Sequence, residues 1–435
     1  VEKYPDKPAF SDTECSITFR QVYDIARNTG AYLVEQLGVD RTPVAVFAGR
    51  KMVTPAYFLG VVYAGRPYAP IDASLPDKRI EKILENLCPG AIVADRESRE
   101  HVESIVDELA KAEGFDRPQI FVAEDISRFE QVACADSNCK ISESAGDAVT
   151  DSENDMLATV RRHMSMTDPL YIIYTSGSTG NPKGVMTSHL SLMTYINAYC
   201  DVMHIEESDV LGNQSPLDYI AAIRDIYLPL KTGCSTAIIP KEYFMEPNAL
   251  FDYMNDKKVS SVGWSVSAFT ILTSLGAFEE VGLKSLRKIC FSGSVMPCRV
   301  LRKWQENLPE AHFVNQYGPT EATASCTYYS VDHLVEEDEV LPIGKAYDNY
   351  RVFLIDEHGN DPAVGEQGEI CVCGPILALG YYNDPERTAA AFTLNPLNRA
   401  YPERMYRTGD YGRLDEAGIL HFCGRMDRQI KHMGH

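Results

Sequence analysis

The chain has 435 residues, a length at which one hydrophobic core no longer keeps growing, so we expect two or three subdomains. Its hydrophobic fraction of 45% excludes global disorder, and no apolar run approaches the roughly 20 residues that a bilayer-spanning helix needs. With 41 basic and 62 acidic residues the net charge is −21, which disfavours nucleic acid and anionic membranes as partners.

The first residues, VEKYPDKPAF, show no signal-peptide pattern and no initiator methionine, which is typical of a start inside a longer protein. Twelve cysteines are too few for a disulfide scaffold of this length and lack paired zinc-site spacing. We interpret them as intracellular thiols and expect a cytoplasmic protein.

Strand-like and helical segments alternate from residue 42 to residue 95. PVAVFAG, PYAPID and AIVAD have the character of strands, and MVTPAYFLGVVYAG and DKRIEKILENL that of helices between them. This alternation predicts a mainly parallel sheet covered by helices. From about residue 124 to residue 168 the chain is polar and acidic, and we expect an exposed insertion there, with a partner-binding loop as the alternative.

The run LYIIYTSGSTGNPKG, residues 170–184, is the most informative stretch of the chain. An apolar strand leads into a loop whose glycines let backbone N–H groups approach and cradle an anion, while hydroxyls add donors and Lys183 adds a positive charge. The pattern is not a Walker loop, because Gly184 follows the lysine where Ser or Thr would stand. It predicts a polyphosphate grip, and a plain surface loop is the alternative. The loop residues concerned are Thr175, Ser176, Gly177, Ser178, Thr179, Gly180 and Lys183.

The alternation resumes after residue 170 with the strand-like runs STAIIP, SSVGWS, RKICFSG and AHFVNQYG. From residue 326 to residue 424 short strands and turns dominate, as in YRVFLIDEHGN, GEICVCG and GILHFCG. The predicted fold class is α/β, with two doubly wound layers packed together over residues 1–325 and a small β-barrel subdomain over residues 326–424.

Polar residues follow several of these strands, at the carboxyl ends where open α/β sheets bind ligands. They form the islands FSGS (291–294), NQYGPTE (315–321), YRTGD (406–410) and GRMD (424–427). Each island alone could be an ordinary turn.

In their order and spacing these motifs resemble those of the AMP-forming adenylating enzymes: acyl-CoA synthetases, firefly luciferase and the amino-acid adenylation domains of nonribosomal peptide synthetases. The peptide-synthetase branch fits best, through ITFRQV, AGRPYAPID, YTSGSTGNPKG, NQYGPTE, GEICVCGPILALGYY, YRTGDY and GRMDRQIKHMG, which cover almost the whole chain. The resemblance implies that a carboxylate attacks the α-phosphorus of MgATP, pyrophosphate leaves, and the acyl-adenylate passes to the phosphopantetheine thiol of a carrier protein.

The same resemblance implies roles in the ATP site. Thr320 would touch the α-phosphate, Glu321 would hold Mg²⁺, Tyr317 would stack on adenine, and Asp410 would bind the ribose hydroxyls with help from Arg425. An acid in a helix first turn is the alternative for Glu321. The expected catalytic residues are Thr175, Lys183, Thr320 and Glu321, and further nucleotide contacts are expected from Gly293, Ser294, Asn315 and Gly318.

The last residues, 425–435, resemble the hinge of the family, after which a small subdomain with a catalytic lysine normally follows. Lys431 matches the hinge-motif lysine, so we expect that subdomain to be absent here and adenylation to be slow. The resemblance also implies neighbouring synthetase domains as partners.

Two alignments compete for the residue that would pair with a substrate ammonium, which needs a counter-charge when it is buried. Without gaps Ile220 stands at the usual Asp position with Arg224 nearby, and a two-residue gap places Asp218 there. The first implies an acid without a paired amine or a grip by Arg224, and the second an ordinary amino acid, which we favour. Small residues at most other pocket positions predict room for a sizeable side chain. Those positions are Gly263, Cys290, Ser292, Gln316, Ala324 and Ser325.

Three other functions stay open at this point. An acyl- or aryl-CoA ligase and a standalone D-alanine-type ligase share the ATP motifs, and a nucleotide-binding module without turnover is a third alternative.

Overall fold

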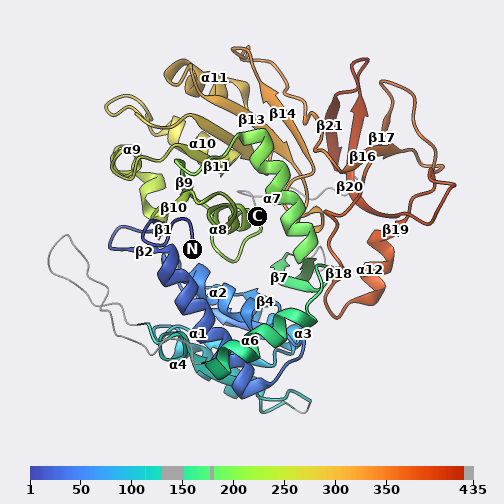
Figure 1. Ribbon diagram of the computed structural model, residues 1–435. Coiled ribbons are helices and arrows are strands. Elements are labelled where there is room, and N and C mark those ends of the chain that lie inside the picture. Colours follow the sequence, from blue (N-terminus) through green and yellow to red (C-terminus); the bar gives the residue numbers. More distant parts are fainter. Residues whose placement is uncertain (113, 130–150, 177–180, 426–435) are drawn as a thin grey trace. The chain divides into compact units, whose positions relative to one another are not determined.

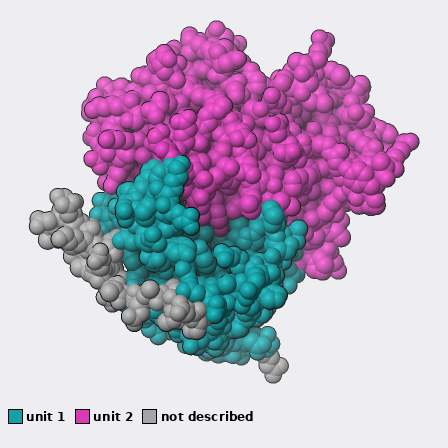
Figure 2. All heavy atoms as spheres, in the orientation of Figure 1, with its two compact units in different colours: residues 1–189, 216–219, 381–383 teal, residues 190–215, 220–380, 384–435 magenta. Residues whose placement is uncertain are grey.

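The computed structural model describes residues 1–112, 114–129, 151–176 and 181–425 (Figure 1). The chain divides into two compact units, coloured in Figure 2. Unit 1 contains Val1–His189, Pro216–Tyr219 and Tyr381–Asn383, and unit 2 contains Leu190–Ser215, Ile220–Gly380 and Asp384–His435. Within the described ranges no helix combines the length and the apolar character that a membrane crossing requires.

Unit 1 is built on a mostly parallel sheet in which the strand order is β8-β7-β4-β3-β5-β6. The parallel strands are β3 (Val44–Phe47), β4 (Tyr68–Pro70), β5 (Ala91–Ala94), β6 (Gln119–Val122) and β7 (Pro169–Thr175). Strand β8 (Lys183–Ser188) runs antiparallel to β7, and β18 (Gly380–Tyr381) follows at that edge. Strands β1 (Pro8–Ser11) and β2 (Ser16–Thr18) form an antiparallel pair.

Two helices of unit 1, over residues 54–63 and 77–87, follow the predicted alternation, and the unit contains others besides. The helices of unit 1 are α1 (Phe19–Leu37), α2 (Thr54–Tyr63), α3 (Asp77–Leu87), α4 (Arg99–Leu109), α5 (Ala123–Ser127) and α6 (Asp151–His163). Helix α1 begins with a capping box, in which the Thr18 hydroxyl accepts from the Gln21 N–H and the Gln21 side chain accepts from the Thr18 N–H.

Helix α6 lies inside the stretch expected to be an exposed insertion, and its Leu157 and Val160 are buried. Their spacing of three places both on one helical face, so this part of the stretch packs despite its polar composition. Residues 130–150 of the expected insertion lie outside the described residues.

Unit 2 contains a second mostly parallel sheet, with the order β15-β14-β13-β12-β11-β9-β10. Strands β9 (Val210–Asn213), β10 (Ser235–Ile238), β11 (Ser261–Ser265), β12 (Lys288–Ser292) and β13 (His312–Tyr317) are parallel, and β14 (Thr327–Val331) and β15 (Lys345–Ala346) are antiparallel. The accompanying helices are α7 (His189–Met203), α8 (Ala222–Thr232), α9 (Pro247–Asp256), α10 (Val266–Ser274) and α11 (Cys298–Asn307), with 3₁₀ turns η1 (Lys241–Met245) and η2 (Thr320–Ala322).

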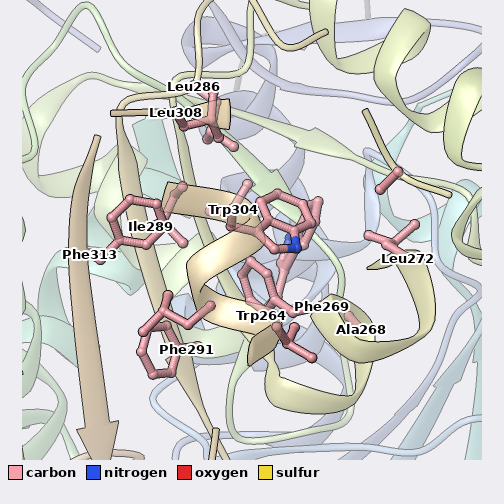
Figure 3. Packing of buried hydrophobic residues seen from close by; sticks show 14 of the residues in the cluster. Trp264, Ala268, Phe269, Leu272, Leu286, Ile289, Phe291, Trp304, Leu308 and Phe313 are labelled. Carbon is pink, nitrogen blue, oxygen red and sulfur yellow. The ribbon is translucent and has the colours of Figure 1, made fainter. Parts of the chain in front are cut away.

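The hydrophobic core of unit 2 is aromatic (Figure 3). Both tryptophans of the chain lie in it, with the rings of Trp264 and Trp304 edge to face at a centroid distance of 6.4 Å. Phe269 packs against Trp304 at 4.8 Å. Because such pairs gain beyond the area that they bury, this cluster fixes β11, α10 and α11 relative to one another.

A small antiparallel sheet completes unit 2, with the order β16-β17-β20-β19 and β21 also paired with β20. Its strands are β16 (Arg351–Ile355), β17 (Gln367–Cys373), β19 (Phe392–Leu394), β20 (Arg404–Leu414) and β21 (Leu420–Arg425), and helix α12 (Pro385–Ala391) precedes β19. Two mostly parallel, helix-covered sheets and one small β-sheet confirm the predicted α/β fold class.

Candidate active site

The predicted phosphate loop joins two adjacent strands of unit 1. Thr175 ends β7 and Lys183 begins β8, and the two residues are paired across the hairpin. The Thr175 Oγ1 atom is buried and has no hydrogen-bond partner among the described residues, as expected of a hydroxyl that donates to a ligand. Ser176 is exposed, and the predicted contacts Gly177, Ser178, Thr179 and Gly180 lie outside the described residues.

Close packing explains why a glycine, Gly184, follows Lys183. A Cβ atom on Gly184 would lie 2.8 Å from Ile172 Cγ2 and 2.9 Å from Tyr174 Cζ across the hairpin. The Tyr174 hydroxyl in turn donates to Asn86 Oδ1 of α3 over 2.7 Å. The close approach of β8 to Tyr174 therefore explains why Ser or Thr, which a Walker loop has at this point, does not stand here.

The residues expected around adenine and ribose meet in unit 2. Tyr317 ends β13, and its hydroxyl donates to Asp410 Oδ2 of β20 over 2.7 Å. Arg425 of β21 is the register partner of Asp410, with 3.6 Å between Arg425 Nε and Asp410 Oδ1. Burial, followed by the nearby Asp410 charge, raises the pKa of Tyr317, so its hydroxyl stays protonated and can donate. The structure thus unites three motifs that are far apart in sequence.

Thr320 and Glu321 lie in the short 3₁₀ turn η2, where Glu321 is an acid in the first turn, as the alternative to the metal role expects. The Glu321 side chain is 3% exposed, and a carboxylate at that depth requires a cation or hydrogen bonds. Its oxygens are the hard ligands that Mg²⁺ prefers, so the residue fits the predicted metal role.

Close packing holds this turn in a strained backbone conformation. Thr323 and Ala324 both have positive φ angles, 47° and 74°, which cost energy in non-glycine residues. A Cβ on Gly318 would lie 2.5 Å from Ser325 Cα, so the loop folds back tightly on itself. The Thr323 hydroxyl donates to the Ile376 carbonyl over 2.6 Å, which ties the turn to the segment before β18.

Two further predicted nucleotide contacts lie in an exposed turn, since Gly293 and Ser294 follow β12 at the surface. Asn315 is buried, and its Nδ2 donates to the Pro342 carbonyl over 2.8 Å, so this amide group is held in place before any ligand binds.

Several predicted pocket residues come together around a buried ion pair in unit 2. Arg224 Nε lies 2.9 Å from Asp225 Oδ1, and both side chains are about 5% exposed or less. Asn213 Nδ2 donates to Asp225 Oδ2 over 2.9 Å, and the guanidinium also donates to the Gly263 carbonyl. A Cβ on Gly263 would lie 2.3 Å from Arg224 Cζ. The room predicted at this glycine is therefore filled by the arginine.

Sequence reasoning missed the tyrosines of this region, of which Tyr195 and Tyr199 interact with Arg224. The Arg224 guanidinium lies 5.5 Å from the centre of the Tyr199 ring, and Tyr195 stands one helical turn away on the same face of α7. Tyr347 and Tyr350 follow β15 and are buried. The spacing of four between the α7 tyrosines was the only available signal, and it equally describes an ordinary core face.

Some polar side-chain atoms in the same region are hydrogen-bonded, and others have no partner among the described residues. Ser325 Oγ donates to Gln316 Oε1 over 3.3 Å, and Ser325 also hydrogen-bonds Tyr195. Burial raises the pKa of the Cys290 thiol to about 12, so it is neutral. Buried polar atoms without a hydrogen-bond partner in the described part of the chain include Gln316 Nε2, Tyr347 Oη and Tyr350 Oη.

The two candidates for the ammonium partner lie in different units. Ile220 belongs to unit 2, is buried, and lies two residues before α8 begins at Ala222. Asp218 belongs to unit 1, where burial and the charge of Asp72 raise its pKa to about 6. Ser292 ends β12 and is half-buried.

Comparisons with known proteins place this geometry in context. The model of the AMP-binding enzyme family matches residues 1–382. The D-alanine–D-alanyl carrier protein ligase of Bacillus thuringiensis (strain Al Hakam) is 31% identical over 441 residues, covering 100% of this chain and 80% of that protein. The same enzyme of Bacillus cereus (strain ATCC 10987 / NRS 248) gives the same values.

Solved structures of nonribosomal peptide synthetases share the fold. FmoA3 (S1046A) is similar with a TM-score of 0.79 and 25% identity over 98% of this chain, which spans only 41% of that protein. The four-domain nonribosomal peptide synthetase holo-AB3403, bound to AMP and glycine, is similar with a TM-score of 0.77 and 23% identity. The match covers 99% of this chain and 28% of the holo-AB3403 chain. With the family model matched from residue 1 to residue 382 and the curated relatives aligned along the entire chain, this protein belongs to the AMP-binding enzyme family, whose members adenylate acids with ATP.

Proposed function

We propose that this protein activates a small amino acid as its acyl-adenylate, releases pyrophosphate, and passes the acyl group to the phosphopantetheine thiol of a carrier protein. The observation that carries the proposal is the junction of Tyr317, Asp410 and Arg425, which brings an aromatic ring, a carboxylate and a guanidinium to one place in unit 2. The 31% identity to carrier-protein ligases along the whole chain supports the acceptor.

The proposed chemistry needs a local reversal of charge, because the chain carries a net charge of −21 and ATP is an anion. Lys183 supplies positive charge and the Thr175 hydroxyl supplies a donor, whereas the charge of Arg425 is shared with Asp410. Mg²⁺ held by Glu321 would neutralise phosphate oxygens as pyrophosphate leaves. Asp410 would orient the ribose through its hydroxyls, so that the acid's oxygen and the α-phosphorus are held in line.

The substrate is proposed to be small and without an anionic side chain. Arg224 fills the space beside Gly263, and Asp225 already neutralises the guanidinium. An added carboxylate would have to compete with Asp225 for the same cation at a buried site, which is costly. Gln316 Nε2, which has no partner within the described ranges, favours an acid that brings a hydrogen-bond acceptor, such as its own carboxylate oxygen, to this amide.

Asp218 is the proposed partner of the α-ammonium. Ile220 is apolar and offers no counter-charge, whereas Asp218, with a pKa of about 6, is mostly ionised at pH 7.5. A standalone D-alanine-type ligase is the second candidate within this function, favoured by the named curated relatives.

An ATP–pyrophosphate exchange screen tests the proposal, with glycine, D- and L-alanine, larger amino acids, aryl acids and fatty acids as substrates. We expect the fastest exchange with the smallest amino acids and its loss in Glu321→Gln. Exchange with aryl or fatty acids alone, followed by transfer to free coenzyme A as fast as to a carrier protein, would contradict it. Exchange that Glu321→Gln leaves unchanged would exclude the proposed metal role.

A further inference from the structure

Lys183, the cation of the proposed phosphate grip, lies against an aromatic ring. Its Nζ is 5.1 Å from the centre of the Tyr381 ring and 3.5 Å from the Tyr381 hydroxyl. Both residues belong to unit 1, and the ring is only 6% exposed. These two distances place the ammonium at the hydroxyl end of the ring, where it can donate to the Tyr381 oxygen and is also attracted by the ring quadrupole.

The chain segment that carries Tyr381 is held in place through the two residues that follow it. The Tyr382 N–H donates to the Gly184 carbonyl over 2.8 Å, next to the lysine. Asn383 Nδ2 donates to the Asn86 carbonyl over 2.8 Å, and the Asn86 side chain accepts from Tyr174 of β7. Asn86 of α3 therefore ties together the segment that carries Tyr381 and the strand that leads into the phosphate loop.

We propose that Tyr381 is a positioning residue for Lys183, and that it sets the affinity for the outer phosphates of ATP. A lysine side chain has four rotatable bonds and loses considerable entropy when it is ordered around a ligand. A ring that already restricts the ammonium near the end of the hairpin lowers that cost on binding. The inference rests on the proposed function of Lys183 and adds to it a residue of a different motif.

The experiment compares two nucleotides by titration calorimetry, since MgATP carries the β- and γ-phosphates and AMP does not. The variants are Tyr381→Leu, Tyr381→Phe, Lys183→Ala and the double variant Lys183→Ala/Tyr381→Leu. Tyr401→Leu serves as the control, because Tyr401 is 55% exposed and lies in unit 2.

We expect Tyr381→Leu to weaken MgATP binding by about tenfold, which lies between the values for an exposed and a desolvated cation–π contact, and to leave AMP binding unchanged. Tyr381→Phe keeps the ring and loses only the hydroxyl contact with Lys183 Nζ, so it should weaken MgATP binding less than Tyr381→Leu does. In the Lys183→Ala background, Tyr381→Leu should have no further effect, because the partner of the ring is gone.

Equal weakening of MgATP and AMP by Tyr381→Leu, or full additivity with Lys183→Ala, would overturn the inference. A Lys183→Ala variant that binds MgATP normally would instead contradict the proposed phosphate grip. A series of phenylalanines with increasing fluorine content at position 381 keeps the shape of the ring and guards against misfolding. The MgATP dissociation constant should rise stepwise along it, and a flat series would overturn the inference.

Discussion

Replacement of Gly263 by alanine tests the position of the buried Arg224 side chain. The new Cβ would lie 2.3 Å from Arg224 Cζ and Nη1 and 2.7 Å from Nη2, distances that force the guanidinium to move. Movement breaks the bond from Arg224 to the Gly263 carbonyl and strains the pair with Asp225. A charge-assisted hydrogen bond contributes about 1.5–3 kcal/mol, and breaking a buried pair costs about 3–5 kcal/mol. We expect a loss of about 3 kcal/mol in the free energy of unfolding.

Tryptophan fluorescence during urea unfolding measures this loss in unit 2 alone, because Trp264 and Trp304 are the chain's two tryptophans and both lie in its core. Gly282→Ala is the matched control, since a Cβ there would meet nothing within 4 Å. It should change stability by no more than about 0.5 kcal/mol. Adding Arg224→Ala should remove the clash, so that Gly263→Ala costs much less in that background. Gly263→Ala with the same unfolding midpoint as Gly282→Ala would refute the placement of Arg224.

Three further predictions concern charge. The pKa of Asp218 is raised to about 6 by burial and by Asp72, whereas an unfolded Asp titrates near about 3.9, so its contribution to stability is complete below about pH 4 and is lost as the pH rises through about 6. Asp218→Asn should remove that loss in urea titrations at pH 4.5 and 7.5, and an unchanged pH dependence would contradict the assignment. Asp410→Asn should weaken MgATP and AMP alike by about tenfold or more in calorimetry, because both carry the ribose; an effect on MgATP alone would speak against ribose binding. Glu321→Gln should reduce Mg²⁺-dependent exchange by about a hundredfold while AMP still binds, and equal loss of AMP binding would indicate misfolding.

The parallel sheets were predictable because their strands are short, apolar and separated by amphipathic helices. DKRIEKILENL became α3 with the predicted residues, and Ile80, Ile83, Leu84 and Leu87 form its buried face. Helix α6 was missed because its buried Leu157 and Val160 are two apolar residues in a polar stretch, too weak a pattern to outweigh composition.

The meeting of Tyr317, Asp410 and Arg425, where the ATP site is proposed, could be anticipated from motifs, since the three residues lie at strand positions that the pattern of strands and turns reveals. The environment of Arg224 could not be predicted from the sequence. Its ion pair with the adjacent Asp225 depends on both side chains leaving the start of α8 toward the same buried region, a direction set by packing against Tyr199 and Gly263. No local pattern in the sequence encodes that direction.

The division of the chain has a consequence for making chimeras. Pro216–Tyr219 and Tyr381–Asn383 are short pieces of unit 1 embedded in the sequence of unit 2. A graft that exchanges residues 190–435 as one block would separate Asp218 and Tyr381 from the rest of unit 1. A hybrid that exchanges the rest of the block but keeps both short pieces native leaves unit 1 intact. In that hybrid Arg224 comes from the donor protein while Asp218 stays native, so the effects of the two residues can be separated.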